Sequence, residues 1–303
     1  MLKSLLKNVK PWYVITHANC MDGFGVYLSC MYFAYTNNIK LPSVMYMNYG
    51  DNLDIDKLKD SNVIIGDFSF DKETLLRINN ISNMLIVLDH HESASMVLND
   101  LPFCKFDNTK SGARLVYEYL FNTKRVPLLI EYIEDRDLWL WEKDYSKEIS
   151  AYLSILDKSD LDLWINLLQN EAYLLSTINI GNGILTYQEQ SVKSKCKNAE
   201  DNLVSWCGEY TVPFINTTTL ISEIGNKLSE EYPFAIMYFI TNDSIVFSFR
   251  SSDKNIDLTK LSLPRGHKHA AGRSFLLKDI DLNILFTAYD VGSYLTSINH
   301  LAK

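Results

Sequence analysis

The chain has 303 residues, of which 47% are hydrophobic and 12% aromatic. A chain this long and this apolar can bury a core, which excludes a disordered or fibrous protein, and its length predicts two domains of about 100–200 residues each. It carries 29 Lys and Arg against 37 Asp and Glu, a net charge of −8. This balance argues against binding long duplex nucleic acid, which needs a basic surface, but not against a small anion held through metal ions.

The sequence shows no signal for export or membrane insertion. Residues 1–10 hold two short apolar pairs broken by lysines, and no run approaches the ~18 apolar residues of a membrane span. The five cysteines are odd in number and are never spaced as CxxC, which argues against a disulfide framework or structural zinc. We expect a cytoplasmic protein with no membrane association.

The first half of the chain alternates apolar strands with helical segments. Strands are predicted at 12–16, 44–47, 63–65 and 85–88, and helices at 25–35, 113–122 and 128–134. Apolar strands separated by helices of about 10–15 residues indicate βαβ units and a mostly parallel sheet. We assign residues 1–150 to this α/β domain.

The rest of the chain changes pattern twice. Residues 151–205 are predicted to be a helical region ending in a linker helix. The last part of this region carries one narrow apolar stripe, formed by Leu185, Val192, Cys196, Ala199 and Leu203. Strands follow at 211–215, 234–240 and 244–249, so residues 206–303 are predicted to form a smaller α/β domain.

Asp and His side chains follow three of the first domain's predicted strands. They are His17 and Asp22 after the first strand, Asp67 after the third, and Asp89, His90 and His91 after the fourth. The carboxyl ends of parallel strands share one edge of a sheet, where ligands bind. Asp and His suit a divalent ion such as Mn²⁺ or Mg²⁺, and several carboxylates favour two ions.

Each residue also has an ordinary interpretation. A single Asp after a strand is more often a helix cap, and a single His at a strand end is usually a hydrogen-bonded surface residue. An Asp-His-His triplet directly after a purely apolar strand is harder to explain in this way. The three positions together favour a metal centre.

These residues, together with Asp135, resemble the motifs of the DHH phosphoesterase superfamily. In the second domain, residues 266–272 (GHKHAAG) are similar to the GGHxxAAG motif of the DHH-associated C-terminal domain, and Arg250-Ser251 resembles the arginine-serine that precedes it. The motifs follow the family's order over essentially the whole chain. The resemblance implies a DHH catalytic domain followed by a substrate-binding domain, as in nanoRNases and oligonucleotide or cyclic-dinucleotide phosphodiesterases.

The resemblance also implies a role for each matching residue. One ion would be held by His17 and the other by Asp22, His90 and Asp135, with Asp67 bridging them. Asp137 is a rival to Asp135. The implied catalytic residues are Asp67, Asp89, His90 and His91, with Asp89 orienting the neighbouring imidazole. The implied substrate-binding residues are His91, Arg250, Ser251, Gly266, His267, Ala270 and Gly272.

The chain departs from the family pattern in two places. The first motif is usually Asp-x-Asp-Gly, and here Cys20 replaces the first Asp, which removes or softens a ligand of the first metal. We keep Cys20 as the weakest candidate ligand, with the carbonyl oxygen of Asn19 as an alternative. The replacement by Cys20 bears on the metal preference and the occupancy of the first position. Arg265 stands where the C-terminal motif usually has glycine.

Three further segments have two interpretations each. Residues 111–113 present either N–H groups for an anion or an ordinary helix cap. Trp139 and Trp141 either stack on a base or pack in the core, and packing is favoured. Residues 270–272 form either part of the substrate site or a tightly packed helix.

The resemblance implies a hydrolase with two divalent ions, Mn²⁺ first and Mg²⁺ or Co²⁺ as alternatives. We expect a phosphodiesterase or exonuclease that converts short single-stranded oligonucleotides to nucleoside monophosphates, by two-metal activation of water. Alternatives are a phosphatase acting on 3′-phosphoadenosine 5′-phosphate, a cyclic-dinucleotide phosphodiesterase, and a non-catalytic nucleotide-binding module with a degenerate metal site. The expected partner is a small nucleotide or short oligonucleotide, and a homodimer is compatible with the sequence.

Overall fold

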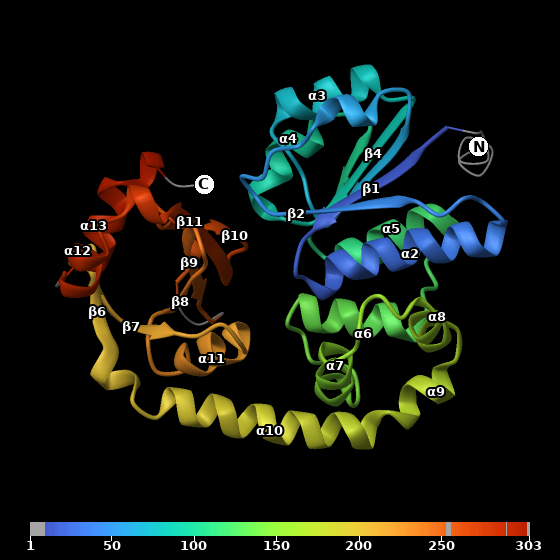
Figure 1. Ribbon diagram of the computed structural model, residues 1–303. Coiled ribbons are helices and arrows are strands. Elements are labelled where there is room, and N and C mark those ends of the chain that lie inside the picture. Colours follow the sequence, from blue (N-terminus) through green and yellow to red (C-terminus); the bar gives the residue numbers. More distant parts are fainter. Residues whose placement is uncertain (1–9, 253–255, 289, 302–303) are drawn as a thin grey trace. The chain divides into compact units, whose positions relative to one another are not determined.

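The computed structural model describes residues 10–252, 256–288 and 290–301 (Figure 1). The chain divides into two compact units, Met1–Leu185 and Thr186–Lys303, and the division falls inside helix α10 (Ile178–Cys196). Residues 1–9, on which the expectation of no export signal rests, lie outside the described part. None of the described helices is both long and apolar enough to cross a membrane.

A five-stranded, fully parallel sheet forms the centre of the first unit. Its strands are β1 (Trp12–His17), β2 (Ser43–Met47), β3 (Asn62–Gly66), β4 (Met84–Asp89) and β5 (Cys104–Phe106). Their order is β2-β1-β3-β4-β5. This order reverses between β1 and β3, and open α/β sheets bind ligands at such a switch point. The predicted α/β class is confirmed.

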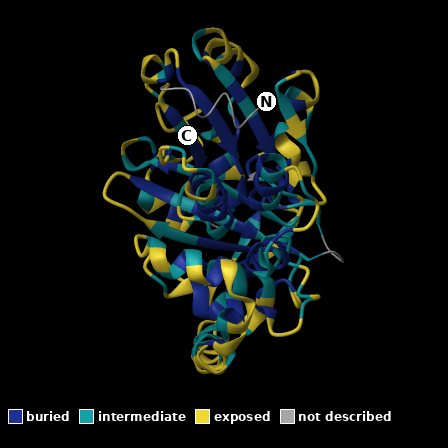
Figure 2. Cartoon of the chain, turned by 90° about the vertical axis from the view of Figure 1, so that its right-hand side faces the viewer, coloured by how far each residue is buried: buried dark blue, intermediate teal, exposed yellow. Residues whose placement is uncertain are grey.

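Helices cover both faces of this sheet, which explains why its strands are apolar without alternation. Helices α2 (Met21–Asn37) and α5 (Gly112–Phe121) lie on one face, and α3 (Lys72–Ile81) and α4 (Ser95–Asn99) on the other (Figure 1). Successive residues of β3 therefore all find a buried environment: Ile64 packs with the α2/α5 layer, and Ile65 with the α3/α4 layer. Strands β1, β3 and β4 are accordingly mostly buried, whereas the outer strands β2 and β5 are mostly half-buried or exposed; Figure 2 colours the chain by this burial.

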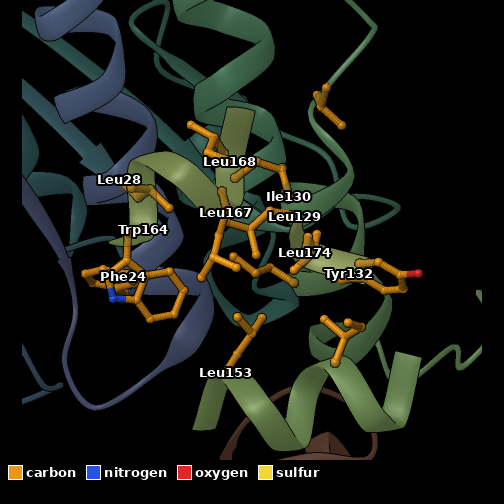
Figure 3. Packing of buried hydrophobic residues seen from close by; sticks show 14 of the residues in the cluster. Phe24, Leu28, Leu129, Ile130, Tyr132, Leu153, Trp164, Leu167, Leu168 and Leu174 are labelled. Carbon is orange, nitrogen blue, oxygen red and sulfur yellow. The ribbon is translucent and has the colours of Figure 1, made fainter. Parts of the chain in front are cut away.

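A helical layer packs against α2 and completes the first unit. It consists of α6 (Leu128–Asp137), α7 (Ser146–Ser154), α8 (Leu161–Gln169) and α9 (Glu171–Ser176). Figure 3 shows its core, in which Phe24 of α2 meets Trp164 of α8 with ring centroids 4.7 Å apart. This packing fixes the rotation of α6, whose last turn carries acidic residues beside the sheet.

An ion-pair group stabilises α5. The Glu118 carboxylate accepts hydrogen bonds from Arg114 Nε, Lys110 Nζ and Lys124 Nζ, each at 2.9 Å. Burial alone would raise the pKa of Glu118, but these cationic donors outweigh it and lower the pKa to about 2.

We expect Glu118→Gln to destabilise the protein by about 1–2 kcal/mol at pH 7, a modest value because Lys124 is exposed and its charge is screened. Because the pKa is depressed in the folded state, the stabilisation is complete above the ordinary pKa of 4.5 and is lost as the pH falls towards 2. Urea unfolding of both proteins between pH 7 and 2 measures this. An equal difference in the free energy of unfolding at pH 7 and at pH 2 would contradict this role of Glu118. The control is Glu189→Gln, which changes an exposed residue of α10.

The second unit is built on a six-stranded mixed sheet of order β10-β11-β9-β8-β7-β6. Its strands are β6 (Leu203–Trp206), β7 (Tyr210–Asn216), β8 (Ala235–Ile240), β9 (Ser244–Arg250), β10 (Arg265–Gly266) and β11 (Ala270–Leu276), and its helices are α11 (Ile221–Leu228), α12 (Leu282–Thr287) and α13 (Val291–Ser297). Strands β7 and β8 are parallel, and the other neighbours are antiparallel.

Two expectations are corrected in the second unit. Residues 270–272 lie in strand β11 rather than in a helix, since Ala270 pairs with Arg250 of β9 across the sheet. The apolar stripe that was taken to continue to Leu203 belongs to a helix only as far as Cys196, and Leu203 begins β6.

Candidate metal centre

A cluster of Asp and His side chains lies at the carboxyl ends of β1, β3 and β4. Asp67, Asp89, His90 and His91 each offer a ligand atom, and these atoms all lie within 4.8 Å of one another. Within the first unit, two trios meet the same criterion: His17, Cys20 and Asp67 form one, and Asp22, His90 and Asp137 form the other. The structure thus brings together the candidates predicted in the first domain, with Asp137 in place of Asp135.

Asp67 occupies the turn after β3 and has a left-handed backbone, with φ of 52°. Asp tolerates this conformation better than most residues do. The backbone N–H of Asp67 still donates to the Leu88 carbonyl of β4 at 3.1 Å, so the residue is fixed at the edge of the sheet. Its Oδ1 lies 3.2 Å from His90 Nε2, and the side chain is buried.

Asp22 is held by the N-terminus of α5. The backbone N–H groups of Gly112 and Ala113 donate to its two carboxylate oxygens at 2.7 and 3.0 Å. Ser111 also caps the helix, accepting from Arg114 N at 3.3 Å. Both interpretations of residues 111–113 therefore hold: the segment is a helix cap, and the anion at its N–H groups is a carboxylate of the same chain.

Gly112 allows this close approach, because a Cβ there would lie 2.5 Å from Asp67 Cβ and 2.8 Å from Asp22 Oδ2. We expect Gly112→Ala to cost about 1–3 kcal/mol in the free energy of unfolding and to weaken metal binding. Gly183→Ala in α10 is a matched control, since nothing lies within 4 Å of its added Cβ and the helix gains about 0.5–1 kcal/mol. Urea unfolding checks both, and equal effects would refute the proposed crowding.

Asp89 organises the turn that follows β4. Its Oδ1 accepts hydrogen bonds from His91 Nδ1 at 2.7 Å and from the backbone N–H groups of His90 and His91 at 2.8 and 3.3 Å. Burial would raise the pKa of Asp89, but the His91 imidazole outweighs burial and holds that pKa below its ordinary value. Asp89 therefore stays ionised, and its hydrogen bond fixes the orientation of the His91 ring.

The cluster holds more negative than positive charge. Burial and the neighbouring Asp22 raise the pKa of Asp67 to about 8, and the same two causes raise that of Asp137 to about 6. Burial would lower the pKa of His90, but its hydrogen bond to Asp67 and the charge of Asp137 raise it to about 10. In the absence of metal, the His90 imidazole therefore lies within 3.9 Å of three carboxylates, those of Asp22, Asp67 and Asp137.

Asp137, and not Asp135, faces this cluster. Asp137 Oδ2 lies 3.5 Å from His90 Nε2, whereas Asp135 Oδ1 accepts a hydrogen bond from Glu142 N at 3.0 Å in the loop after α6. Residues two apart on a helix point in different directions, so the two carboxylates cannot both face the sheet. The structure therefore pairs Asp137 with His90, while Asp135 Oδ2 is also buried without a hydrogen-bond partner among the described residues, so the choice of metal ligand between the two stays a prediction.

The two tryptophans in the loop after α6 form a cation–π group. The Arg136 guanidinium lies 4.4 Å from the Trp139 ring centroid and 5.4 Å from that of Trp141. Both tryptophans are partly buried, and both have a left-handed backbone, with φ of 58° and 55°. They therefore pack on Arg136 rather than in the apolar core.

The residues of the cluster fit divalent metal ions. Among the described side chains, Asp67 Oδ2 and Asp89 Oδ2 are buried without a hydrogen-bond partner, and such oxygens are costly unless a cation satisfies them. Burial and the nearby His91 lower the pKa of His17 to about 4, so its imidazole is neutral and able to bind a metal. Carboxylate oxygen with imidazole nitrogen is a donor set typical of Mn²⁺ and related ions.

Tyr49 lies beside the cluster and was not predicted. Its ring stacks on Phe68 with centroids 4.7 Å apart, and it meets the His17 and His91 rings at 6.0 and 6.2 Å. Its position follows from the sheet order, which places β2 next to β1 and brings the residues after β2 to the same edge. The sequence signal that could have identified Tyr49 is its location two residues beyond the predicted strand 44–47.

The candidate substrate residues of the second domain gather where β9, β10 and β11 meet. Gly266 has φ of 139°, which suits glycine, and His267 N donates to the Ala270 carbonyl at 2.8 Å across the turn. Arg250 Nη2 donates to Ser222 Oγ at 3.1 Å, and the hydroxyl of Ser251 donates to the Ile256 carbonyl at 2.6 Å. Gly272 lies in β11 on the strand paired with β9. Their role in binding substrate stays a prediction.

Comparison with known proteins adds to this geometry. No protein-family model matches the chain. The uncharacterised protein R106 of Acanthamoeba polyphaga mimivirus is 28% identical over 286 residues, which are 86% of this chain and 67% of that protein. The solved structure of exonuclease RecJ bound to manganese is 11% identical and has a TM-score of 0.50, covering 99% of this chain and 91% of that chain. The pGpG-specific phosphodiesterase PggH from Vibrio cholerae is 12% identical, with a TM-score of 0.41 over 97% of this chain and 100% of that chain.

The chain has the fold of the DHH phosphoesterases. The likeness to RecJ extends over 99% of the chain and confirms the resemblance seen in the motifs. Within this DHH fold, the buried Asp and His side chains have the arrangement expected of a metal site. The comparison therefore shows the fold, and the cluster within it is a candidate metal site.

Proposed function

We propose that this protein uses two divalent ions, Mn²⁺ first, to hydrolyse phosphodiester bonds in short oligonucleotides and release nucleoside monophosphates. One observation carries the proposal: a buried Asp/His cluster, with carboxylate oxygens that lack hydrogen-bond partners in the described structure, lies at the switch point of a DHH-type sheet. The similarity in fold to a manganese-bound exonuclease supports this choice of reaction and ion.

The residues of the cluster would hold two ions. Asp67 belongs to the trio with His17 and Cys20 and also lies against His90 of the other trio, so it would bind both ions. Asp22, fixed by α5, and Asp137 would complete the second position. When bound, the ions would polarise a phosphoryl oxygen and lower the pKa of an attacking water towards neutrality.

His91 is suited to bind the substrate phosphate. Burial would lower the pKa of His91, but the carboxylate of Asp89 raises it above its ordinary value, which favours the protonated form of the ring. Asp89 holds one ring nitrogen at 2.7 Å, which fixes the direction of the other. A protonated imidazole in a fixed orientation can donate a hydrogen bond to a phosphate oxygen.

The second domain would hold the part of the substrate away from the cleaved bond. Arg250 offers a planar guanidinium for a further phosphate, and the turn at 266–270 allows close approach of backbone N–H groups. The net charge of −8 favours short substrates, because few phosphates would find positive charge outside the metal centre.

Hydrolysis assays with Mn²⁺ test the proposal. We expect a dinucleotide to be cleaved to nucleoside monophosphates, and we expect a chelator or His90→Ala to abolish cleavage. Preferred turnover of a cyclic dinucleotide or of 3′-phosphoadenosine 5′-phosphate would move the assignment to another phosphoester. Nucleotide binding without turnover of any of these would replace the enzyme with a binding module.

A further inference from the structure

Cys20 lies in the metal centre, at the place where the DHH pattern has an aspartate. Its sulfur is within 4.8 Å of a ligand atom of His17 and of a carboxylate oxygen of Asp67. Asp67 is buried, and its Oδ2 has no hydrogen-bond partner in the part of the chain that the structure describes. The thiol therefore stands next to a carboxylate that needs a cation.

The backbone fixes this position from several sides. Cys20 precedes α2 with an extended backbone, and its side chain makes no capping hydrogen bond to the helix. The Cys20 carbonyl accepts from Phe24 N at 3.3 Å and from Lys158 Nζ at 3.1 Å. The preceding Ala18 N–H donates to Met47 of β2 at 2.9 Å. The loop is thus tied to two other elements while the thiol has no part in capping.

The other cysteines differ from Cys20. Cys30 is buried in the apolar layer between the sheet and α2, and no group of potential ligands among the described residues includes Cys104, Cys196 or Cys207. Membership of a ligand group is therefore particular to Cys20 among the thiols of the described structure.

The three side chains have a recognisable chemistry. One thiolate, one imidazole and one carboxylate are the ligand types that Zn²⁺ and Co²⁺ accept, and three protein ligands leave one position open, as in catalytic zinc sites. Sulfur is a soft ligand that Mg²⁺ does not favour, whereas carboxylates and imidazole also suit Mn²⁺. Metal binding itself removes the thiol proton, so a neutral thiol in the metal-free protein is no obstacle.

We propose that the sulfur of Cys20 binds one of the two ions, so that this position selects Zn²⁺ or Co²⁺ over Mg²⁺. The position formed by Asp22, His90 and Asp137 lacks sulfur and keeps the preference for Mn²⁺ or Mg²⁺. The protein would then work with two unlike ions. This inference rests on the proposed two-metal centre and deepens it.

Titration of the metal-free full chain with Co²⁺ tests the proposal without any substrate. A sulfur ligand produces a charge-transfer absorption band in the near ultraviolet, and we expect this band in the wild-type protein. We expect Cys20→Ser and Cys20→Asp to lose the band while the visible absorption of bound Co²⁺ remains. Cys196→Ser, which changes a partly buried thiol of the other unit, should keep the band.

A competition assay with a chromophoric chelator gives a second measurement. We expect Cys20→Asp to weaken Zn²⁺ binding at least about tenfold while Mg²⁺ binding holds or improves. Co²⁺ binding to the wild type without the charge-transfer band would overturn the role of Cys20 and leave the metal centre intact. Failure of the folded wild type to bind Co²⁺, Zn²⁺ or Mn²⁺ would overturn the metal centre and the proposed function together.

Discussion

Asp67→Asn is expected to lower kcat/KM for dinucleotide hydrolysis about a thousandfold or more. An amide has no negative charge to hold two cations together. Metal ions contribute several kcal/mol of transition-state stabilisation, and each loss of about 1.4 kcal/mol lowers the rate tenfold. Asp67 also touches both groups of ligands, so its loss affects both positions. Steady-state kinetics over a range of Mn²⁺ concentrations measures the effect.

The same substitution should stabilise the metal-free protein. Burial and the neighbouring Asp22 disfavour the ionised form of Asp67 in the folded protein, whereas the same carboxyl ionises freely in the unfolded chain, so replacing it with an amide removes this cost of folding. Thermal unfolding without metal should therefore occur at a higher Tm for Asp67→Asn, and added Mn²⁺ should raise that Tm less than it raises the Tm of the wild type. An inactive variant with a lowered Tm would point to a folding defect, and full activity would rule out the two-metal mechanism.

Asp137→Asn and Asp135→Asn form a matched pair on one helix turn. We expect Asp137→Asn to reduce kcat/KM about a hundredfold or more and to shift the Mn²⁺ midpoint upwards, because Asp137 lies with Asp22 and His90. Asp135→Asn should cost no more than about tenfold, because an amide oxygen can still accept the hydrogen bond from Glu142 N.

The comparison of these two variants distinguishes a carboxylate that binds metal from one that only supports the loop at 138–142. Both kcat/KM and the rise in Tm produced by Mn²⁺ should be smaller for Asp137→Asn than for Asp135→Asn. The opposite ranking would show that α6 is rotated differently in the working enzyme and would return Asp135 to the metal. Equal losses would indicate that the loop at 138–142, rather than either carboxylate, controls the site.

The fold class and most candidate metal ligands could be predicted from the sequence because the patterns that indicate them are local. Uninterrupted apolar runs such as Val63-Ile64-Ile65 identify strands buried on both faces, and a parallel sheet brings the residues that follow such strands to one edge. His17, Asp67 and the Asp89-His90-His91 triplet follow this rule, and the structure brings them together. The α/β class therefore followed from the alternation of apolar strands with helices, and the candidate metal centre from the residues that follow the strands.

The tertiary structure decided what depends on how elements pack. Asp135 and Asp137 have similar neighbours in the sequence, and only the rotation of α6, fixed by its packing against α2 and α8, selects which one faces His90. Residues 270–272 look the same in a packed helix or in a strand until their pairing with β9 and β10 is known. Likewise, the motif made Cys20 only the weakest candidate ligand, and it was the fold that placed its sulfur within 4.8 Å of ligand atoms of His17 and Asp67.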